Sequence, residues 1–222
     1  MVPKTQYQEQ KKNYQKMMED LIKKFDSKKT LLLHACCAPC SSYVIESLAK
    51  YFDITIYYYN PNIHPQQEYE RRLQELKNFL ANFPLAKNGQ VKLIETEYNP
   101  EDYFKATNVR EEIELQKEAE KGERCRRCYL FRMKKAWNYA VENDFDYFST
   151  TLTISPFKDS EKVNIIGFNL EDTIKNLTEI KSHWLPSDFK KKSGFLRSLQ
   201  LSDEYGLYRQ NYCGCIYSKI NH

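Results

Sequence analysis

Short apolar runs alternate along the chain with longer stretches in which apolar residues recur every three or four positions. The short runs predict buried strands, and the longer stretches predict amphipathic helices. Strands are expected at residues 30–35, 54–60, 91–97 and 145–152. Helices are expected at residues 5–26, 40–52, 65–83, 124–143 and 157–172, with shorter helical pieces between 100 and 121. The tail from residue 182 onward has no clear period and predicts no regular element.

Strands that alternate with helices predict an α/β fold, Rossmann-like, with a mostly parallel sheet and helices on both of its faces. In such sheets, binding sites lie beyond the carboxyl ends of the strands. The 222 residues predict a single domain (1–222), in which an N-terminal helix (5–26) is appended to a core of about 27–218. A chain of this length buries roughly 70–75% of its unfolded surface, so it needs no disulfide to fold.

Charge and hydropathy limit the partners and the compartment that we expect for the protein. The formal net charge of +4 permits a nucleic-acid partner without requiring one. No apolar run approaches the roughly 20 residues of a membrane span, and the N-terminus is polar and charged rather than signal-like. We therefore expect a cytoplasmic protein with no membrane partner. In that reducing compartment, cysteine clusters indicate metal or redox chemistry more often than structural disulfides.

All seven cysteines fall into three short motifs. They are the loop group (Cys36, Cys37 and Cys40), the CxxC pair (Cys125 and Cys128) and the CGC pair (Cys213 and Cys215). The loop group follows the first predicted strand, where an α/β sheet places its active site. The CxxC pair begins a predicted helix, so its two thiols share one face of the first turn.

Three kinds of chemistry could use such motifs. Disulfides fit poorly, because adjacent cysteines form strained rings and an odd number leaves one thiol unpaired. A structural zinc ion takes four ligands, and seven thiolates overfill one such site. A 4Fe–4S cluster also takes four thiolates and leaves three for a second metal or a redox-active pair. The cysteine pattern therefore favours an iron–sulfur site.

Four arginines, Arg124, Arg126, Arg127 and Arg132, surround the CxxC pair. A cluster held by four thiolates is anionic, and a buried anion needs compensation. The positive end of the helix dipole would also lower the pKa of the two thiols. The same arginines are equally compatible with a solvated helix face or a phosphate-binding patch.

Five segments carry a resemblance to a known family, and they occur in this order: LLLHACCAPCSSYVIESL, YYYNPNIHPQQEYERRLQEL, KGERCRRCYLFRMKKA, FSTTLTISPFKDSEKVNIIG and DFKKKSGFLRSLQLSDEYGLYRQNYCGCIYS. Together they resemble the cobalamin-independent epoxyqueuosine reductases of bacterial queuosine biosynthesis, from about residue 25 to 218. The cysteine doublet, the YNPNIHP loop, the RCxxC helix start and the terminal YCGC make the resemblance specific. The N-terminal helix lies outside it.

The resemblance implies an oxidoreductase that reduces the epoxide of epoxyqueuosine, at the wobble position of tRNA, to the cyclopentene of queuosine. It implies a 4Fe–4S cluster with a mononuclear iron or redox-active thiols beside it, on a fold like that of the adenine-nucleotide α-hydrolases. The implied partners are tRNA carrying epoxyqueuosine and an electron donor that the sequence does not identify. Some relatives carry an acidic residue where this chain has Cys40, so any second iron would here gain a softer ligand.

Two assignments of the thiols stay open at this stage. In the first, which the resemblance suggests, Cys36 and Cys37 hold the cluster with the CxxC pair, and the CGC pair is redox-active. In the second, Cys37 and Cys40 share an iron with one CGC thiol, because neighbouring side chains such as Cys36 and Cys37 tend to diverge. Cys36 then joins the CxxC pair and the other CGC thiol at the cluster. Both assignments require all seven sulfurs to converge on one site.

Other residues are candidates for binding substrate or supplying protons. His64, in the YNPNIHP loop, could contact substrate or act as an acid, or could simply bond within its loop. Lys158, after the fourth strand, could meet a phosphate, and Tyr212 could pack on the cluster or donate a proton. His34 is expected to be a satisfied core histidine beside the site. The segment 189–197, FKKKSGFLR, could contact RNA or be an ordinary solvated loop.

Two rival functions share parts of this pattern. A sulfur-inserting tRNA enzyme would also carry a cluster, but it needs a glycine-rich phosphate loop after the first strand. The corresponding segment here, CCAPCSS, contains no glycine. A zinc-stabilised RNA-binding module would use the thiols without catalysis, and it would be colourless where an iron–sulfur protein is brown.

Overall fold

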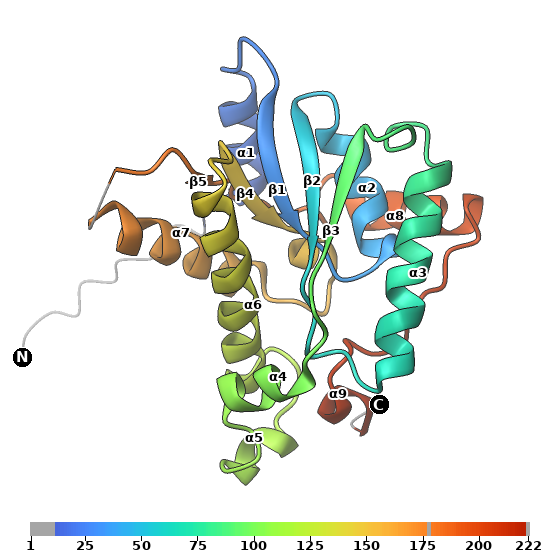
Figure 1. Cartoon of the computed structure of the whole chain (residues 1–222), viewed down its shortest axis with the longest axis vertical. Coiled ribbons are helices and arrows are strands. Elements are labelled where there is room, and N and C mark those ends of the chain that lie inside the picture. The colour runs from blue at the N-terminus through green and yellow to red at the C-terminus, as the bar shows by residue number, and fades with distance from the viewer. Residues whose placement is uncertain (1–11, 177–178, 221–222) are drawn as a thin grey trace, which may run out of the picture.

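The computed structural model describes residues 12–176 and 179–220. Within these ranges, five strands form one parallel sheet in the order β3–β2–β1–β4–β5. They are β1 (Lys29–His34), β2 (Phe52–Tyr58), β3 (Val91–Glu95), β4 (Tyr147–Thr150) and β5 (His183–Trp184). Their carboxyl ends point toward the lower half of Figure 1. The predicted α/β fold with a parallel sheet is confirmed.

Helices cover both faces of this sheet (Figure 1). One face carries α1 (Tyr14–Ile22), α2 (Ala38–Leu48), α3 (Gln66–Asn82) and α8 (Gly194–Glu204); the other carries α6 (Glu123–Glu142) and α7 (Ser160–Lys175). Successive side chains of β1 enter different cores, because Leu31 and Leu33 join the first and Leu32 joins the second. Burial on both faces explains why this strand has a continuous apolar sequence instead of alternating residues.

Local capping explains where several helices begin. The side chain of Asp159 accepts hydrogen bonds from two backbone N–H groups in the first turn of α7. Pro39 lies in the first turn of α2, where the N–H that proline lacks has no helical partner. The charged segment between 100 and 121 forms the expected helical pieces, α4 (Pro100–Thr107) and α5 (Ile113–Lys117).

The aperiodic tail contains three elements that the apolar pattern did not predict: β5, α8 and α9 (Ile216–Ile220). β5 has only two residues, which is too short for a periodic signal. α8 buries Ser198 and Ser202 on its inner face, so its apolar stripe is interrupted. Both hydroxyls donate to carbonyls of the preceding helical turn, and this satisfies them without apolar neighbours.

Several expected boundaries differ from the structure. The helix expected at 40–52 is α2 and ends at Leu48, and Phe52 instead begins β2. The fourth strand ends at Thr150 instead of residue 152, because a 3₁₀ turn, η1 (Thr151–Ile154), follows it directly. The first helix runs over Tyr14–Ile22 rather than to residue 26, and positions 5–11 of its expected range lie outside the described residues. Among the residues that the structure describes, no helix is both long and apolar enough to cross a membrane.

Candidate active site and metal centre

The loop group lies at the carboxyl end of β1, which is the central strand of the sheet. The chain leaves β1 toward β2 on one side and reaches β4 on the other, so this edge is the topological switch point of the sheet. Cys37 is the extended residue directly before α2, and Cys40 lies in the first turn of that helix. The strand end and the helix start therefore hold the three thiols in one short loop.

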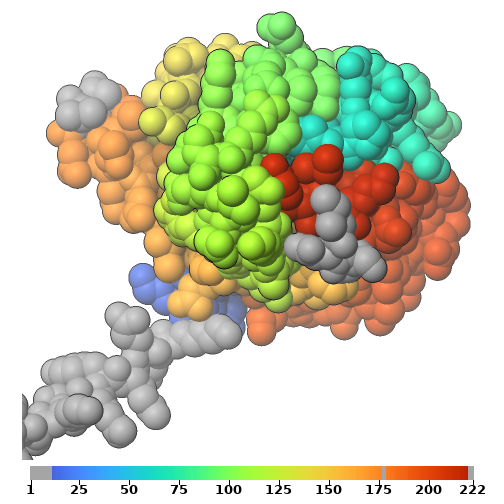
Figure 2. Space-filling model, turned by 90° about the horizontal axis from the view of Figure 1, so that it is seen from below, coloured from blue at the N-terminus to red at the C-terminus, as the bar shows by residue number. Residues whose placement is uncertain are grey.

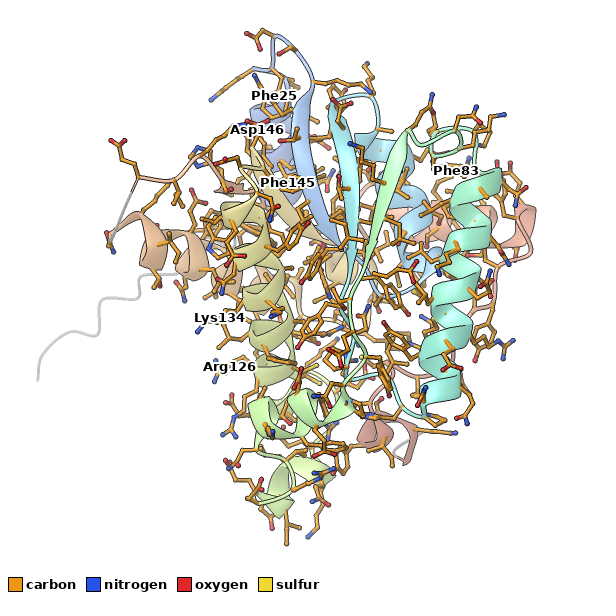
Figure 3. The ribbon with its side chains drawn as sticks, viewed as in Figure 1. Phe25, Phe83, Arg126, Lys134, Phe145 and Asp146 are labelled. Carbon is orange, nitrogen blue, oxygen red and sulfur yellow. The ribbon has the colours of Figure 1, made fainter. Side chains whose placement is uncertain are left out.

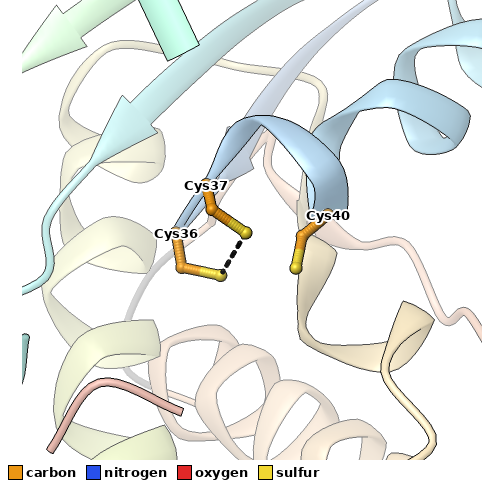
Figure 4. A group of neighbouring side chains, drawn as sticks. All are labelled: Cys36, Cys37 and Cys40. Carbon is orange, nitrogen blue, oxygen red and sulfur yellow. Dashed lines mark hydrogen bonds between the residues drawn. The ribbon is translucent and has the colours of Figure 1, made fainter. Parts of the chain in front are cut away.

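The three sulfurs of the loop group lie within 4.8 Å of one another. Figure 4 shows them turned toward a common point, with 3.7 Å between the Sγ atoms of Cys36 and Cys37. Two thiolates bound tetrahedrally at about 2.3 Å from one metal ion lie about 3.8 Å apart. Cys36 and Cys37 therefore have the spacing of two ligands to a single ion, and Cys40 lies close enough to be a third ligand.

The other four thiols surround a separate, smaller cavity. Cys125 and Cys128 reach it from the first turns of α6, and the CGC pair reaches it from the C-terminal segment. Figure 2 shows this segment, at the red end of the colour scale, between the green region of α4 and α5 and the cyan region near α3. Segments far apart in sequence thus meet at this edge of the molecule.

Cys213 joins the two groups of thiols. It lines the small cavity and also a larger one of about 300 Å³ that opens beside the loop group. Residues after β1, including Cys36 and Cys40, line the larger cavity together with Thr151 and Leu152 after β4. The prediction that the three cysteine motifs come to one site is consistent with these shared linings.

Burial and mutual hydrogen bonding give the three thiols of the loop group different pKa values. Hydrogen bonds from the thiols of Cys37 and Cys40 hold the pKa of Cys36 well below its usual range, and Arg132 acts in the same direction. Burial raises the pKa of Cys37 to about 12, and bonding to the Cys36 thiolate raises that of Cys40. In the protein alone, the group is thus arranged around one thiolate.

Two buried arginines face these thiols from opposite sides. Arg132 of α6 lies near the sulfurs of Cys128, Cys213 and Cys36, which keep its pKa high although burial would lower it. Arg72 of α3 pairs with the Glu68 carboxylate at 2.7 Å and also donates to the carbonyl oxygen of Cys213 at 3.0 Å. Both arginines are 1% exposed, so their charge must be balanced inside the protein, by Glu68 for Arg72 and by the thiols for Arg132.

The arginines around the CxxC pair divide between the two predicted roles. Arg124 and Arg132 are buried, as charge compensation requires. Arg126 and Arg127 instead form ion pairs with Glu123, and Figure 3 shows Arg126 on the outer side of α6. The burial of Arg124 and Arg132 is consistent with charge compensation, which stays a prediction, and the ion pairs of Arg126 and Arg127 fit a solvated helix face.

Several buried polar groups around the small cavity have no partner among the residues that the structure describes. They are the hydroxyl group of Tyr129, the side-chain amide of Asn62 and two nitrogens of Arg124. A buried polar group left unpaired costs about 1–3 kcal/mol. Three such side chains beside four thiols fit a bound group that is negatively charged and accepts hydrogen bonds, as an iron–sulfur cluster does.

Lys158 lies where a binding role would place it. Its side chain is buried in the lining of the larger cavity, and its ammonium nitrogen lies 3.6 Å from the Glu120 carboxylate. Burial would lower the pKa of Lys158, but Cys213, Tyr129 and Glu120 outweigh this effect and raise it. The lysine is therefore a fixed cation inside the cavity.

The two histidine predictions fare differently. His34 is fully buried and hydrogen-bonded to the Thr150 hydroxyl and the Tyr59 carbonyl, which confirms it as a satisfied core residue. Burial lowers its pKa to about 3, so it stays neutral. His64 is absent from the lining of both cavities; its ring stacks on Phe104, and its backbone N–H donates to the Gly214 carbonyl. A substrate role for His64 stays a prediction.

Tyr212 lines the larger cavity, but its hydroxyl already donates to the carbonyl of His64 at 2.6 Å. The basic segment 189–197 is only partly exposed to the site. Phe189 is buried in the core, and Lys190 and Lys192 form ion pairs with Asp188 and Glu19. Phe195 is the residue of that segment that lines the cavity.

Three residues of the site, Arg72, Asn62 and Gln210, were not predicted from the sequence. The side-chain amide nitrogen of Gln210 lies 3.1 Å from the Cys37 sulfur. A signal for Arg72 was present, since it follows Tyr69 by three positions and precedes Leu76 by four on the apolar stripe of α3. A charged residue on a buried stripe needs a buried partner. Asn62 stood inside the YNPNIHP loop, but no periodicity distinguished it there.

The fold and the site together define a class: α/β enzymes with a cluster of thiols, able to hold a metal, at the carboxyl edge of a parallel sheet. Residues 31–221 match the family model described as epoxyqueuosine reductase QueH. The chain therefore belongs to the epoxyqueuosine reductase QueH family, whose members are oxidoreductases.

Several proteins named epoxyqueuosine reductase QueH are similar to this chain. One from Streptococcus pyogenes is 40% identical over 212 residues, covering 94% of this chain and 79% of its own length. One from Staphylococcus epidermidis is 38% identical over 214 residues, covering 95% and 86%. One from Thermotoga maritima is 33% identical over 193 residues, covering 86% and 91%. The similarity thus extends beyond the cysteine motifs to most of the fold.

Proposed function

We propose that this protein reduces the epoxide of epoxyqueuosine in tRNA and so forms queuosine. The observation that carries the proposal is the loop group, whose three sulfurs lie within 4.8 Å of one another. Two of these cysteines line a cavity of about 300 Å³, in a chain that belongs to a family named for this reaction. The reaction consumes two electrons and two protons, and the epoxide oxygen leaves as water.

The residues of the cavity would bind and orient the substrate. Leu152 and Ile154 give one wall an apolar surface that limits access of water to the loop group. Lys158 supplies a buried cation that can neutralise charge as the epoxide opens. Iron bound by the thiols would supply electrons and a Lewis acid for the epoxide oxygen.

For the cofactor, we propose that the loop group holds one iron and that the remaining four cysteines hold a 4Fe–4S cluster. The 3.7 Å separation of the Cys36 and Cys37 sulfurs supports a shared ion, and the unpaired donors around the small cavity support the cluster. This division keeps Cys40 as an iron ligand, as predicted. It differs from both sequence-based assignments, since each of those placed Cys36 with the CxxC pair.

A tRNA substrate and seven free cysteines support the predicted cytoplasmic location. Because each turn of the reaction consumes two electrons, the protein requires a separate electron donor. Cys213 lines both cavities, which supports its role as the link between the cluster and the substrate.

Activity of the isolated protein tests the proposal. Protein reconstituted anaerobically with iron and sulfide receives a one-electron reductant and tRNA that contains epoxyqueuosine. Digestion and mass spectrometry should then show queuosine at the expense of epoxyqueuosine. A brown protein with a full cluster that forms no queuosine would overturn the proposed function. A colourless protein that retains only zinc would favour an RNA-binding module.

A further inference from the structure

A single aromatic side chain stands out at the larger cavity. Phe157 lines it, and this residue is 61% exposed. This is the highest exposure among the large apolar side chains in the described part of the chain. A lone exposed apolar residue on an open surface needs no explanation. An exposed ring beside the thiols of Cys36 and Cys40 is different, because any substrate that reaches those thiols enters the same cavity.

A tight turn places Phe157 at the cavity. The N–H of Phe157 donates to the hydroxyl oxygen of Ser155 at 3.2 Å, and the N–H of Lys158 donates to the Ser155 carbonyl at 3.2 Å. These bonds form the turn between η1 and α7. Because the turn already orders the backbone that carries the ring, a ligand that covers the ring has only the side-chain torsions left to order.

The surroundings of Phe157 suit a nucleotide more than a protein side chain. The cavity of about 300 Å³ is at the lower end of the range for small ligands, which is enough for one base. Lys158 lies inside it as a buried cation, and the exposed guanidinium of Arg209 stands 5.7 Å from the ring of Phe195 on the same lining. Aromatic rings combined with cations are what single-stranded nucleic acid requires for stacking and charge.

We infer that Phe157 is the stacking platform that receives the modified base of the tRNA wobble nucleotide as it leaves the anticodon loop. The inference rests on the proposed function for the identity of that base. Phe157 would be a positioning residue: its ring would hold the plane of the base so that the attached ring with its epoxide points toward the loop group. No bond is made or broken at Phe157.

A double-mutant cycle between protein and RNA tests this contact, and it requires no turnover. The probes are two anticodon stem-loops, one with guanosine at the wobble position and one with an abasic site there. Both are titrated against the reconstituted wild type and the Phe157→Ala variant. Loss of a base-stacking contact weakens binding by about 5- to 150-fold. We expect that loss with the guanosine loop and a change of less than about twofold with the abasic loop.

Two further variants sharpen the result. Phe157→Tyr keeps an aromatic face and should restore binding of the guanosine loop. Phe157→Trp should report the contact directly, because stacking of guanosine on the indole should quench its fluorescence, whereas the abasic loop should not. Ile165→Ala is the matched control: Ile165 is an exposed apolar residue of α7, 48% exposed, outside the cavity lining.

The outcomes separate the inference from the proposed function. If Phe157→Ala weakens both stem-loops equally, or neither, the ring does not stack on the wobble base and the inference is overturned. Failure of the wild type to bind the guanosine loop also overturns it. If the cycle shows the base-dependent loss but the wild type forms no queuosine from epoxyqueuosine tRNA, the stacking role stands and the proposed reaction fails.

Discussion

At the scale of single residues, charge balance at the thiols depends on a few buried side chains. Arg132 is 1% exposed, and one of its nitrogens donates to the Asn60 side chain at 3.3 Å, while another has no partner within residues 12–176 and 179–220. A guanidinium in such a position is costly unless negative charge lies beside it. The thiols of Cys128, Cys213 and Cys36 supply that charge once they are ionised or bound to metal.

Replacing this arginine should weaken cofactor binding. We expect Arg132→Met to fold, because the methionine fills most of the space, but to lose iron about 10- to 100-fold more readily than the wild type. Iron and sulfide content after gel filtration against a chelator, with circular dichroism to monitor folding, measures this. Arg126→Met is the matched control on the same helix, since Arg126 is exposed and pairs with Glu123. Equal iron retention in both variants would contradict the assigned role.

Cys40 makes a second prediction at this scale. We expect Cys40→Ala to lose about one iron per protein and to retain the visible absorption of the cluster, because the loop group is assigned a single ion. Cys40→Asp should keep that iron, since a carboxylate is also an iron ligand. Iron analysis beside the absorption spectrum gives both values. Loss of cluster absorption in Cys40→Ala would show that this cysteine serves the cluster instead.

At the scale of elements, close packing through small residues joins helices to the sheet. Gly167 of α7 faces the indole of Trp184 in β5, and a Cβ added there would lie 2.2 Å from the ring. Gly194 at the start of α8 similarly lies against Tyr43 of α2. These contacts fix β5 and α8, two of the three elements that the apolar pattern failed to predict.

Enlarging one of these contacts should destabilise the fold without touching the site. Overpacking lowers the stability of a fold by about 1–3 kcal/mol. In a chain of this size, each kcal/mol lost lowers the melting temperature by about 2–4 °C. We therefore expect Gly167→Ala to lower the melting temperature by about 3–10 °C. Calorimetry measures the change, with Asn169→Ala as the control because Asn169 is exposed on the same helix. An unchanged melting temperature would mean that α7 can move away from β5 at no cost.

At the scale of the whole molecule, the thiols connect three distant parts of the chain. The loop group follows β1, the CxxC pair begins α6, and the CGC pair lies in the C-terminal segment. That segment is also bound by Arg72, which donates to the carbonyl of Cys213, and by His64, whose N–H donates to Gly214. A cluster held by the CxxC and CGC pairs would add coordination bonds between α6 and the C-terminal segment.

Removal of the metal should therefore loosen one region more than the rest. We expect chelation under reducing conditions to increase backbone hydrogen exchange first in residues 206–220, while β1 and β2 at the centre of the sheet keep their protection. The reason is that the central strands are held by ladder hydrogen bonds and two apolar cores. Exchange followed by mass spectrometry, with the iron-loaded protein as reference, measures this. A uniform increase along the chain would show that the cofactor stabilises the fold as a whole.

The sequence alone determined the strand–helix alternation, the parallel sheet and the place of the loop group. The period of apolar residues and the position of a motif after a strand depend only on residues that are neighbours in the sequence. The apolar run of β1 leads directly into Cys36 and Cys37. The resemblance in the cysteine motifs also named the family correctly. His34 was placed correctly because a histidine on a buried strand must bond to its neighbours.

Only the tertiary structure decided how the thiols group and which charges serve them. The spacing of cysteines along the chain does not say that Cys213 borders both cavities or that Arg72 of α3 reaches its carbonyl oxygen. These contacts join residues more than 100 positions apart, and they depend on how α3, α6 and the C-terminal segment pack at one edge of the sheet. The role inferred for Phe157 likewise depends on the cavity, which is lined by segments that are far apart in the sequence.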